Sequence, residues 1–259
     1  MAQTMIKMGS LFAGIGGFEK GAEMAFNEAG IPHQTLWQVE QNKYCQKVLA
    51  RHWPTAKIYD DVRNIKKDNV APVDVIMAGF PCQDISSAGL QRGIYEGEKS
   101  SLWWEVWRIA RDLRPRVLVL ENVANILRLG GSDVVGSLTE IGYNAEWSII
   151  SARERGACHL RERWFCVAYT KSRPSSHRDT IIEAKEDREA WSNSIEFGQQ
   201  YPQGLQSTFW QRHPHPSAFC RVDDGIPNRS HRLKALGNAI VPQCSQYVFE
   251  CIIKSGLLS

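Results

Sequence analysis

The chain has few of the features that mark a secreted, membrane-bound or metal-binding protein. Its 259 residues include seven cysteines, an odd number, with no Cys-x-x-Cys pair. That pattern argues against a disulfide framework and against a structural zinc site. No apolar run reaches the length of a signal peptide or of a membrane span. We therefore expect a cytoplasmic protein that uses no metal and has no membrane partner.

A strong excess of one charge and a phosphate-binding loop are also missing. The net charge of +3 permits nucleic-acid binding without arguing for it. No Gly-x-x-x-x-Gly-Lys segment occurs, so nothing here is built to clamp a nucleotide polyphosphate. Positive charge is concentrated between residues 151 and 173, where six basic side chains stand against two acidic ones. An ordinary solvated surface could have the same composition.

Apolar runs and helical patterns alternate through the first 170 residues, which predicts parallel βαβ units and an α/β fold. The expected strands are 6–12, 34–40, a short one before Asp60, 73–80, 117–121, 145–151 and 164–169. The expected helices are 18–29, 43–52, 100–113 and 134–141.

The chain changes character after residue 170. Residues 171–231 are rich in Ser, Pro, His, Gln and Arg without sustained periodicity, and so long a loop in a compact domain is usually functional. Helical spacing returns over 243–253. We predict a main domain over 1–170, a small insert over 171–231, and a segment over 232–259 that returns to the main domain.

Two reactive side chains stand at predicted strand ends. Cys82 follows an apolar run and a stiffening proline, Pro81, and Glu121 ends the next apolar run. Strand ends of a parallel sheet line its ligand crevice, where a thiol can act as a nucleophile. A buried structural cysteine and a helix-capping glutamate are the plain alternatives.

A glycine turn, Gly14-Ile15-Gly16-Gly17, joins the first strand to the first helix, and Glu40 ends the second strand. Glycines there let a ligand approach the backbone, and the acid can accept hydrogen bonds from ribose hydroxyls. The pattern is weak by itself, because a NAD enzyme could show it too.

Five blocks in this order resemble the cytosine-5 DNA methyltransferase family, and a chance match to all five is remote. The blocks are Phe12-Ala13-Gly14-Ile15-Gly16-Gly17, Pro81-Cys82-Gln83, Glu121-Asn122-Val123, Arg161-Glu162-Arg163 and Gly237-Asn238-Ala239. The resemblance implies a Rossmann-like, S-adenosylmethionine-dependent methyltransferase fold: a mostly parallel seven-stranded sheet with a small irregular target-recognition insert.

The resemblance also implies a chemistry. Cys82 would attack C6 of a cytosine flipped out of duplex DNA, so that C5 takes the methyl group. Glu121 would bind N3 and the exocyclic amine, with its pKa raised by apolar neighbours. Arg163, supported by Arg161, would bind the cytosine O2, and the polar segment 83–99 would close over the base.

The family pattern further assigns a cofactor pocket for S-adenosylmethionine, with Glu40 on the ribose and with Asp61 and Val62 at the edge and face of the adenine. Its full set is Phe12, Gly14, Ile15, Gly16, Glu40, Asp61, Val62, Gly79, Pro81, Leu102, Asn238 and Ala239. A solvated strand end for Glu40, a turn acid for Asp61, and core positions for Val62 and Leu102 are the alternatives.

Two departures from the family pattern concern the target. His159 stands where the family usually has Gln, and the block closing the recognition domain is barely recognisable in 221–229, as in the short phage or prophage-type members. Residues offered as base readers are Arg178, Arg188, Gln199, Gln200, Gln203, Gln206, Gln211 and Arg212.

We expect a monomer that acts on double-stranded DNA, with a cognate restriction endonuclease as a partner in the cell. Two alternatives stay open at this stage. The first is a tRNA cytosine-5 methyltransferase, because one RNA-directed branch resembles the DNA enzymes in the same motifs. The second is a non-catalytic nucleic-acid-binding protein that retains the fold.

Overall fold

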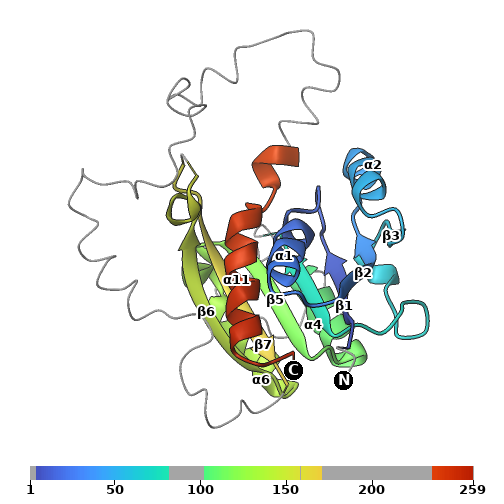
Figure 1. Cartoon of the computed structure of the whole chain (residues 1–259). Helices are drawn as coiled ribbons and strands as arrows, with labels where there is room; N and C mark the ends of the chain where they lie inside the picture. Colours follow the sequence, from blue (N-terminus) through green and yellow to red (C-terminus); the bar gives the residue numbers. More distant parts are fainter. Residues whose placement is uncertain (1–3, 82–101, 158, 171–234, 259) are drawn as a thin grey trace, which may run out of the picture.

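Seven strands form a single sheet in the computed structural model, which describes residues 4–81, 102–157, 159–170 and 235–258 (Figure 1). The strand order is β3-β2-β1-β4-β5-β7-β6. The strands from β3 to β5 in this order run parallel, and β7 is antiparallel to both of its neighbours. The predicted mostly parallel, seven-stranded sheet is confirmed. The strands are β1 (Ile6–Leu11), β2 (His33–Val39), β3 (Lys57–Tyr59), β4 (Val75–Gly79), β5 (Val117–Val123), β6 (Asn144–Ser151) and β7 (Glu162–Tyr169).

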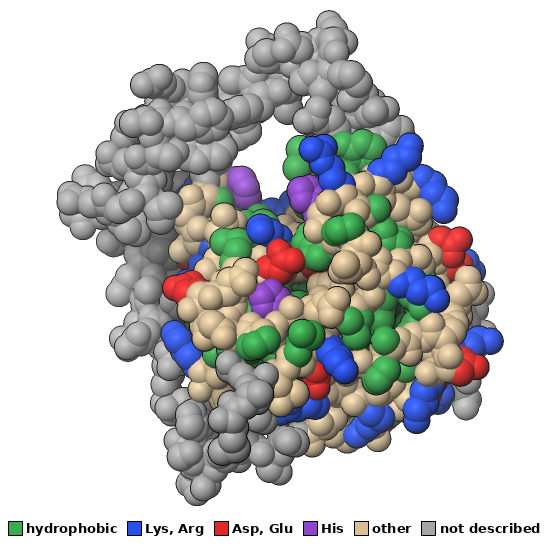
Figure 2. Space-filling view, turned by 45° about the vertical axis from the view of Figure 1, so that its right-hand side comes forward, with side chains coloured by type: hydrophobic (Ala, Val, Ile, Leu, Met, Phe, Trp, Pro, Cys, Tyr) green, Lys and Arg blue, Asp and Glu red, His purple; other side chains and the backbone are tan. Residues whose placement is uncertain are grey.

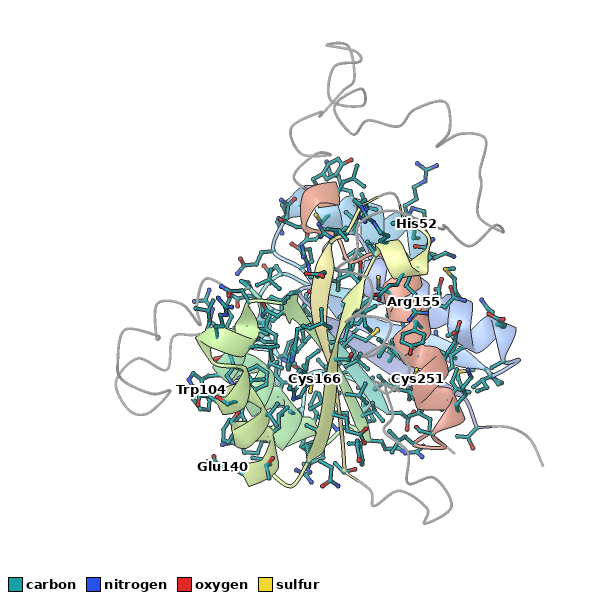
Figure 3. All side chains as sticks on the ribbon, turned by 90° about the vertical axis from the view of Figure 1, so that its left-hand side faces the viewer. His52, Trp104, Glu140, Arg155, Cys166 and Cys251 are labelled. Carbon is teal, nitrogen blue, oxygen red and sulfur yellow. The ribbon has the colours of Figure 1, made fainter. Side chains whose placement is uncertain are left out.

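Helices cover both faces of this sheet. Figures 1 and 3 show α1 and α11 side by side on one face, and Trp104 of α4 and Glu140 of α6 on the other. The helices are α1 (Gly17–Glu28), α2 (Lys43–His52), α4 (Leu102–Leu113), α5 (Ile126–Leu129), α6 (Gly131–Glu140) and α11 (Pro242–Lys254), with short 3-10 turns η1 (Val62–Asn64) and η2 (Arg153–Arg155).

The central strands alternate their side chains between two cores. Met77 and Val119 pack beneath α1 and α11, whereas Ile76 and Leu118 pack beneath α4 and α6. Because both faces are covered, β4 and residues 117–120 of β5 are continuous apolar runs, as expected for buried parallel strands.

The C-terminal helix α11 docks closely on α1. A Cβ added to Gly21 would lie 2.4 Å from the carbonyl oxygen of Pro242, so the two helices touch through backbone. The Ser245 hydroxyl donates a buried hydrogen bond to the carbonyl of Phe18, 2.9 Å away. This contact brings the segment that precedes α11 to the glycine turn, at the start of α1.

Element boundaries follow the sequence to within a few residues: β4 is shorter than the predicted 73–80, and α6 begins at Gly131 rather than at 134. The helix over 43–52 is found as predicted, but β5 continues past Glu121 to Val123, and α5 was not foreseen. Cys82, the segment 83–99 and the proposed insert 171–231 lie outside the described residues, so the proposed domain division stays a prediction.

Candidate active site

The predicted site residues that the structure describes on strands β4, β5 and β7 and after β1 and β2 lie at one edge of the sheet. Parallel strands present their carboxyl ends at the same edge, and the register pairs Gly79 at the end of β4 with Glu121 on β5. Strand β7 is antiparallel, so its first residues lie at this edge too, with Arg163 paired to Val123. The turn after β1 and the residues after β2 complete the same edge.

The glycine turn after β1 has one open position and one packed position. Phe12 and Gly14 both have a positive φ, of 56° and 57°. This conformation is uncommon for an aromatic residue and is concentrated at functional sites. A Cβ on Gly14 would meet nothing within 4 Å, whereas one on Gly16 would lie 2.2 Å from the Trp53 ring. Gly14 therefore leaves the backbone accessible to a ligand, and Gly16 serves packing.

Glu40 joins the glycine turn to the end of β2. One carboxylate oxygen accepts a hydrogen bond from the Gly14 N–H at 2.8 Å, and the other accepts from the Asn42 N–H at 2.7 Å. A carboxylate has about four lone-pair positions, so it can accept further bonds from hydroxyls. The solvated-strand-end alternative does not fit, because the side chain is half-buried and fixed at both oxygens.

Asp61 and Val62 are engaged within the protein. Asp61 accepts hydrogen bonds from the backbone and guanidinium of Arg63, which lower the pKa of its carboxyl. Val62 is buried in the core beneath α4. Leu102, which begins α4, is half-buried and packs against the same core.

Glu121 and Arg163 form an ion pair across the sheet edge. The Arg163 Nε lies 3.0 Å from Glu121 Oε1, and Glu121 is 9% exposed. Burial raises the pKa of this carboxyl to about 7, against the opposing effect of Arg163 and Arg161. The raised pKa agrees with the sequence expectation. Near neutral pH the group can therefore exist in either protonation state.

Asn122 connects this strand end to the turn that precedes Cys82. Its side-chain amide donates to the carbonyl of Phe80 at 3.0 Å, and its amide oxygen accepts from the Val123 N–H at 2.8 Å. Pro81 is exposed and is the last described residue before Cys82. The role of Asn122 was missed from the sequence, although an amide at the end of a buried apolar strand is the signal for it.

Arg161 connects the site to the segment before α11. Its guanidinium donates to the carbonyl of Ala239 at 2.6 Å, and its backbone has a positive φ of 36°. Ala239 is half-buried, and Asn238 next to it is exposed. Burial lowers the pKa of Arg161, with Arg163 as a second cause.

A cavity of about 990 Å³ opens beside these arginines. Basic and histidine side chains border a hollow near the upper edge of the face in Figure 2. The cavity is lined by Ile15, Gly16, Gly17, Lys20, Glu23, His52, Trp53, His159, Arg161, Arg163, Leu236, Ala239, Ile240, Val241 and Pro242.

The structure describes four cysteines, and all four are buried free thiols: Cys45, Cys166, Cys244 and Cys251. Burial raises the pKa of Cys45 and of Cys244 to about 11, and it also raises those of Cys166 and Cys251. A thiol with so high a pKa is a poor nucleophile at neutral pH. Within the described residues, no helix is both long enough and apolar enough to span a bilayer.

Comparison with known proteins places these residues in a family. The model of the C-5 cytosine-specific DNA methylase family matches residues 6–213. The type II methyltransferase M.CviJI of Paramecium bursaria Chlorella virus IL3A is 31% identical over 241 residues, which are 92% of this chain and 57% of that protein. M.Bsp6I of Bacillus sp. (strain RFL6) is 31% identical over 170 residues, 64% of this chain and 52% of that one. The chain spans about half the length of these relatives.

Among solved structures, the Entamoeba histolytica methyltransferase EhMeth aligns over 97% of this chain and 99% of its own length. Its TM-score is 0.63 at 15% sequence identity. A DNA modification methyltransferase encoded within an E. coli prophage aligns over 69% of this chain and 54% of its own, with a TM-score of 0.52 and 21% identity. These likenesses support the methyltransferase fold.

Proposed function

Because the chain belongs to the C-5 cytosine-specific DNA methylase family, we propose that it methylates C5 of a flipped-out cytosine in duplex DNA. S-adenosylmethionine is the proposed methyl donor, and Cys82 the proposed nucleophile. The observation that carries the proposal is the ion pair of Glu121 and Arg163 at the strand ends. A buried acid beside a fixed guanidinium matches the acceptor and donor groups along one edge of cytosine.

The residues present fit the cofactor. Gly14 leaves its backbone open, and Glu40 keeps lone pairs free for ribose hydroxyls beside it. Phe12, Ile15 and Leu102 are half-buried apolar residues, available to contact the apolar parts of the cofactor. When bound, S-adenosylmethionine supplies an electrophilic methyl group.

The protein groups then act on the base. The Cys82 thiolate forms a bond to C6 while protonated Glu121 hydrogen-bonds N3, so that charge developing on the ring is stabilised. Arg163 donates to O2. C5 now carries the electron pair that takes the methyl group. Loss of the C5 proton to a base then expels the Cys82 thiolate, which breaks the C6–S bond and restores the aromatic ring.

The cavity beside Arg161 and Arg163 supports a nucleic-acid substrate. Its lining carries Lys20, Arg161, Arg163 and two histidines against a single acid, Glu23. Glu23 lies 3.5 Å from Lys20 Nζ and accepts from the Trp53 indole N–H, so Lys20 and Glu23 offset each other. The excess positive charge of the lining therefore rests on Arg161 and on Arg163, which pairs with Glu121. The remaining positive charge favours a phosphate backbone.

A trapping experiment tests this function. Wild-type protein with S-adenosylmethionine should form a covalent adduct with a duplex containing 5-fluorocytosine, because fluorine cannot leave as the C5 proton does. Cys82→Ala should form no adduct and transfer no methyl group, while it still binds the cofactor. Methyl transfer by Cys82→Ala would eliminate the proposed nucleophile.

A second experiment distinguishes DNA from tRNA as the substrate. Transfer of a tritiated methyl group to duplex DNA but not to tRNA would support the proposed DNA substrate over the RNA alternative.

We also propose that the protein acts as a monomer and that a restriction endonuclease of the same cell recognises the same site. Its relatives bear the name type II methyltransferase. Light scattering of the protein on a single-site duplex tests the first proposal. Protection of methylated DNA from an endonuclease extracted from the source cells tests the second.

A further inference from the structure

A buried acid beneath the glycine turn has no part in the proposed chemistry. Glu19 lies in the first turn of α1 and is fully buried, as is Gln38 on β2. The Gln38 side-chain amide donates to Glu19 Oε1 at 2.8 Å. Burying an acid and an amide costs free energy unless they are paired. Their pairing therefore calls for an explanation beyond core packing.

The position of the pair supplies that explanation. Glu19 follows the glycine turn by two residues, and Gln38 precedes Glu40 by two. The same two segments meet again above, where the Ala13 N–H donates to the carbonyl of Val39 and the Gly14 N–H donates to Glu40. The Glu19–Gln38 contact thus joins the two elements that carry the two sides of the proposed cofactor pocket.

We propose that Glu19 and Gln38 form a positioning clip that holds the glycine turn against the end of β2, and so fixes Gly14 and Glu40 for S-adenosylmethionine. This inference rests on the proposed function. Neither residue touches the cofactor in this proposal, since both act through the turn and the strand end above them.

The buried donors and acceptors of the pair indicate that the protonated Glu19 carboxyl stabilises the clip better than the ionised carboxylate does. Glu19 Oε2, Gln38 Oε1 and the Ser10 hydroxyl are all buried, and none of them has a hydrogen-bond partner among the described residues. A proton on Oε2 gives Glu19 a donor, and its neighbours Gln38 and Ser10 each have a free acceptor. Consistent with this, burial raises the pKa of Glu19 to about 6, opposed by the hydrogen bond from Gln38. The neighbours facing it are Ser10 on β1, Gln38 on β2 and, as the charged group, Glu23 on α1.

Three variants test the clip by calorimetric titration with S-adenosylmethionine. Glu19→Leu keeps the volume but strands the Gln38 amide, and it should weaken cofactor binding roughly tenfold with little change in kcat at saturation. Glu19→Gln keeps a donor and an acceptor and should bind within about twofold of wild type. Ser255→Ala removes a buried hydrogen bond to the carbonyl of Ile252 at the C-terminal end of α11, away from the glycine turn, and it should leave cofactor affinity unchanged.

A second readout covers the case in which Glu19→Leu does not fold. Wild-type affinity should rise as pH falls through about 6, and Glu19→Gln should lose that dependence. The clip would be overturned if Glu19→Leu bound S-adenosylmethionine with wild-type affinity, if Ser255→Ala lost as much affinity as Glu19→Leu, or if Glu19→Gln kept the wild-type pH profile. If the wild-type protein binds no S-adenosylmethionine, the proposed function fails instead.

Discussion

The side-chain amide of Asn122 donates a hydrogen bond to the carbonyl of Phe80, 3.0 Å away, and so ties the end of β5 to the turn before Cys82. Glu121, the adjacent residue, pairs with Arg163. One strand end therefore holds the acid and also fixes the backbone from which the proposed nucleophile is presented.

We predict that Asn122→Ala will slow methyl transfer strongly while leaving cofactor affinity near wild type. The substitution leaves a buried carbonyl and a buried N–H without partners, which costs roughly 1–3 kcal/mol of stability. Single-turnover rates and calorimetry measure the two effects separately. Asn125→Ala is the matched control, because Asn125 is exposed and its side chain makes no capping bond. Equal rates in both variants would contradict the positioning role.

Glu121 should make catalysis depend on pH. Its pKa of about 7 means that the protonated form, which donates to N3, is lost as pH rises through that value. The single-turnover rate should fall above pH 7. Glu121→Gln should lower the single-turnover rate by a factor of roughly 10²–10⁴, and its rate should no longer fall above pH 7. A wild-type rate in Glu121→Gln would remove Glu121 from the acid role.

The same residue affects stability with a defined sign. The folded pKa of about 7 exceeds the ordinary value of 4.5, so between these values the folded protein binds more protons than the unfolded chain. Its contribution to the free energy of unfolding therefore falls as pH rises from 4.5 to about 7. Urea denaturation of wild type and Glu121→Gln across this range measures the difference.

Local signals predicted the framework, whereas individual long-range hydrogen bonds could not be predicted. Helix α2 was predicted correctly because its apolar spacing and Asn42, whose side chain accepts from Tyr44 and Cys45, are local features. The link from Arg161 to Ala239 spans 78 residues and depends on how α11 docks on α1. No local sequence pattern indicates that these two residues are in contact.

The buried acid Glu19 was missed for a different reason. It precedes Ala22 by three residues and Phe26 by seven, so it lies on the buried face of α1. That spacing was available, but an acid in the first turn of a helix is normally a solvated group that favours the helix dipole. Only the partner on β2 reveals its role.

Glu40→Ala should weaken S-adenosylmethionine binding and leave DNA affinity unchanged. The substitution removes the proposed hydrogen bond to a ribose hydroxyl, and a hydrogen bond to a charged group is worth about 1.5–3 kcal/mol, or roughly 10- to 150-fold in affinity. Calorimetry with the cofactor measures the loss. Asp60→Ala, an exposed acid after the neighbouring strand β3, is the control. If the two variants bind equally well, Glu40 has no role in the pocket.

The recognised DNA site should be short or degenerate. The proposed insert has 61 residues between 171 and 231, and only some of its side chains can reach base edges. Each good bidentate contact gives about 1–3 kcal/mol of discrimination, so a few contacts specify roughly two to four base pairs. Methylation mapping of DNA from cells that express the protein tests this. A strict motif of six or more defined bases would refute it.

Gly79 should be needed for full methyl-transfer activity, because its missing side chain leaves space for the Glu121 carboxyl. A Cβ at Gly79 would lie 3.2 Å from Glu121 Oε2 and 3.2 Å from Ile240 Cδ1, closer than such atoms normally approach. Gly79→Ala must therefore shift the Glu121 carboxyl or the Ile240 side chain by a few tenths of an ångström, and we expect roughly a tenfold loss of kcat, about 1.4 kcal/mol. Gly136→Ala on α6 is the matched control, because its added Cβ meets nothing within 4 Å. That variant should keep full activity and gain about 0.5–1 kcal/mol of stability from helix propensity. Full activity in Gly79→Ala would show that Glu121 does not depend on this space.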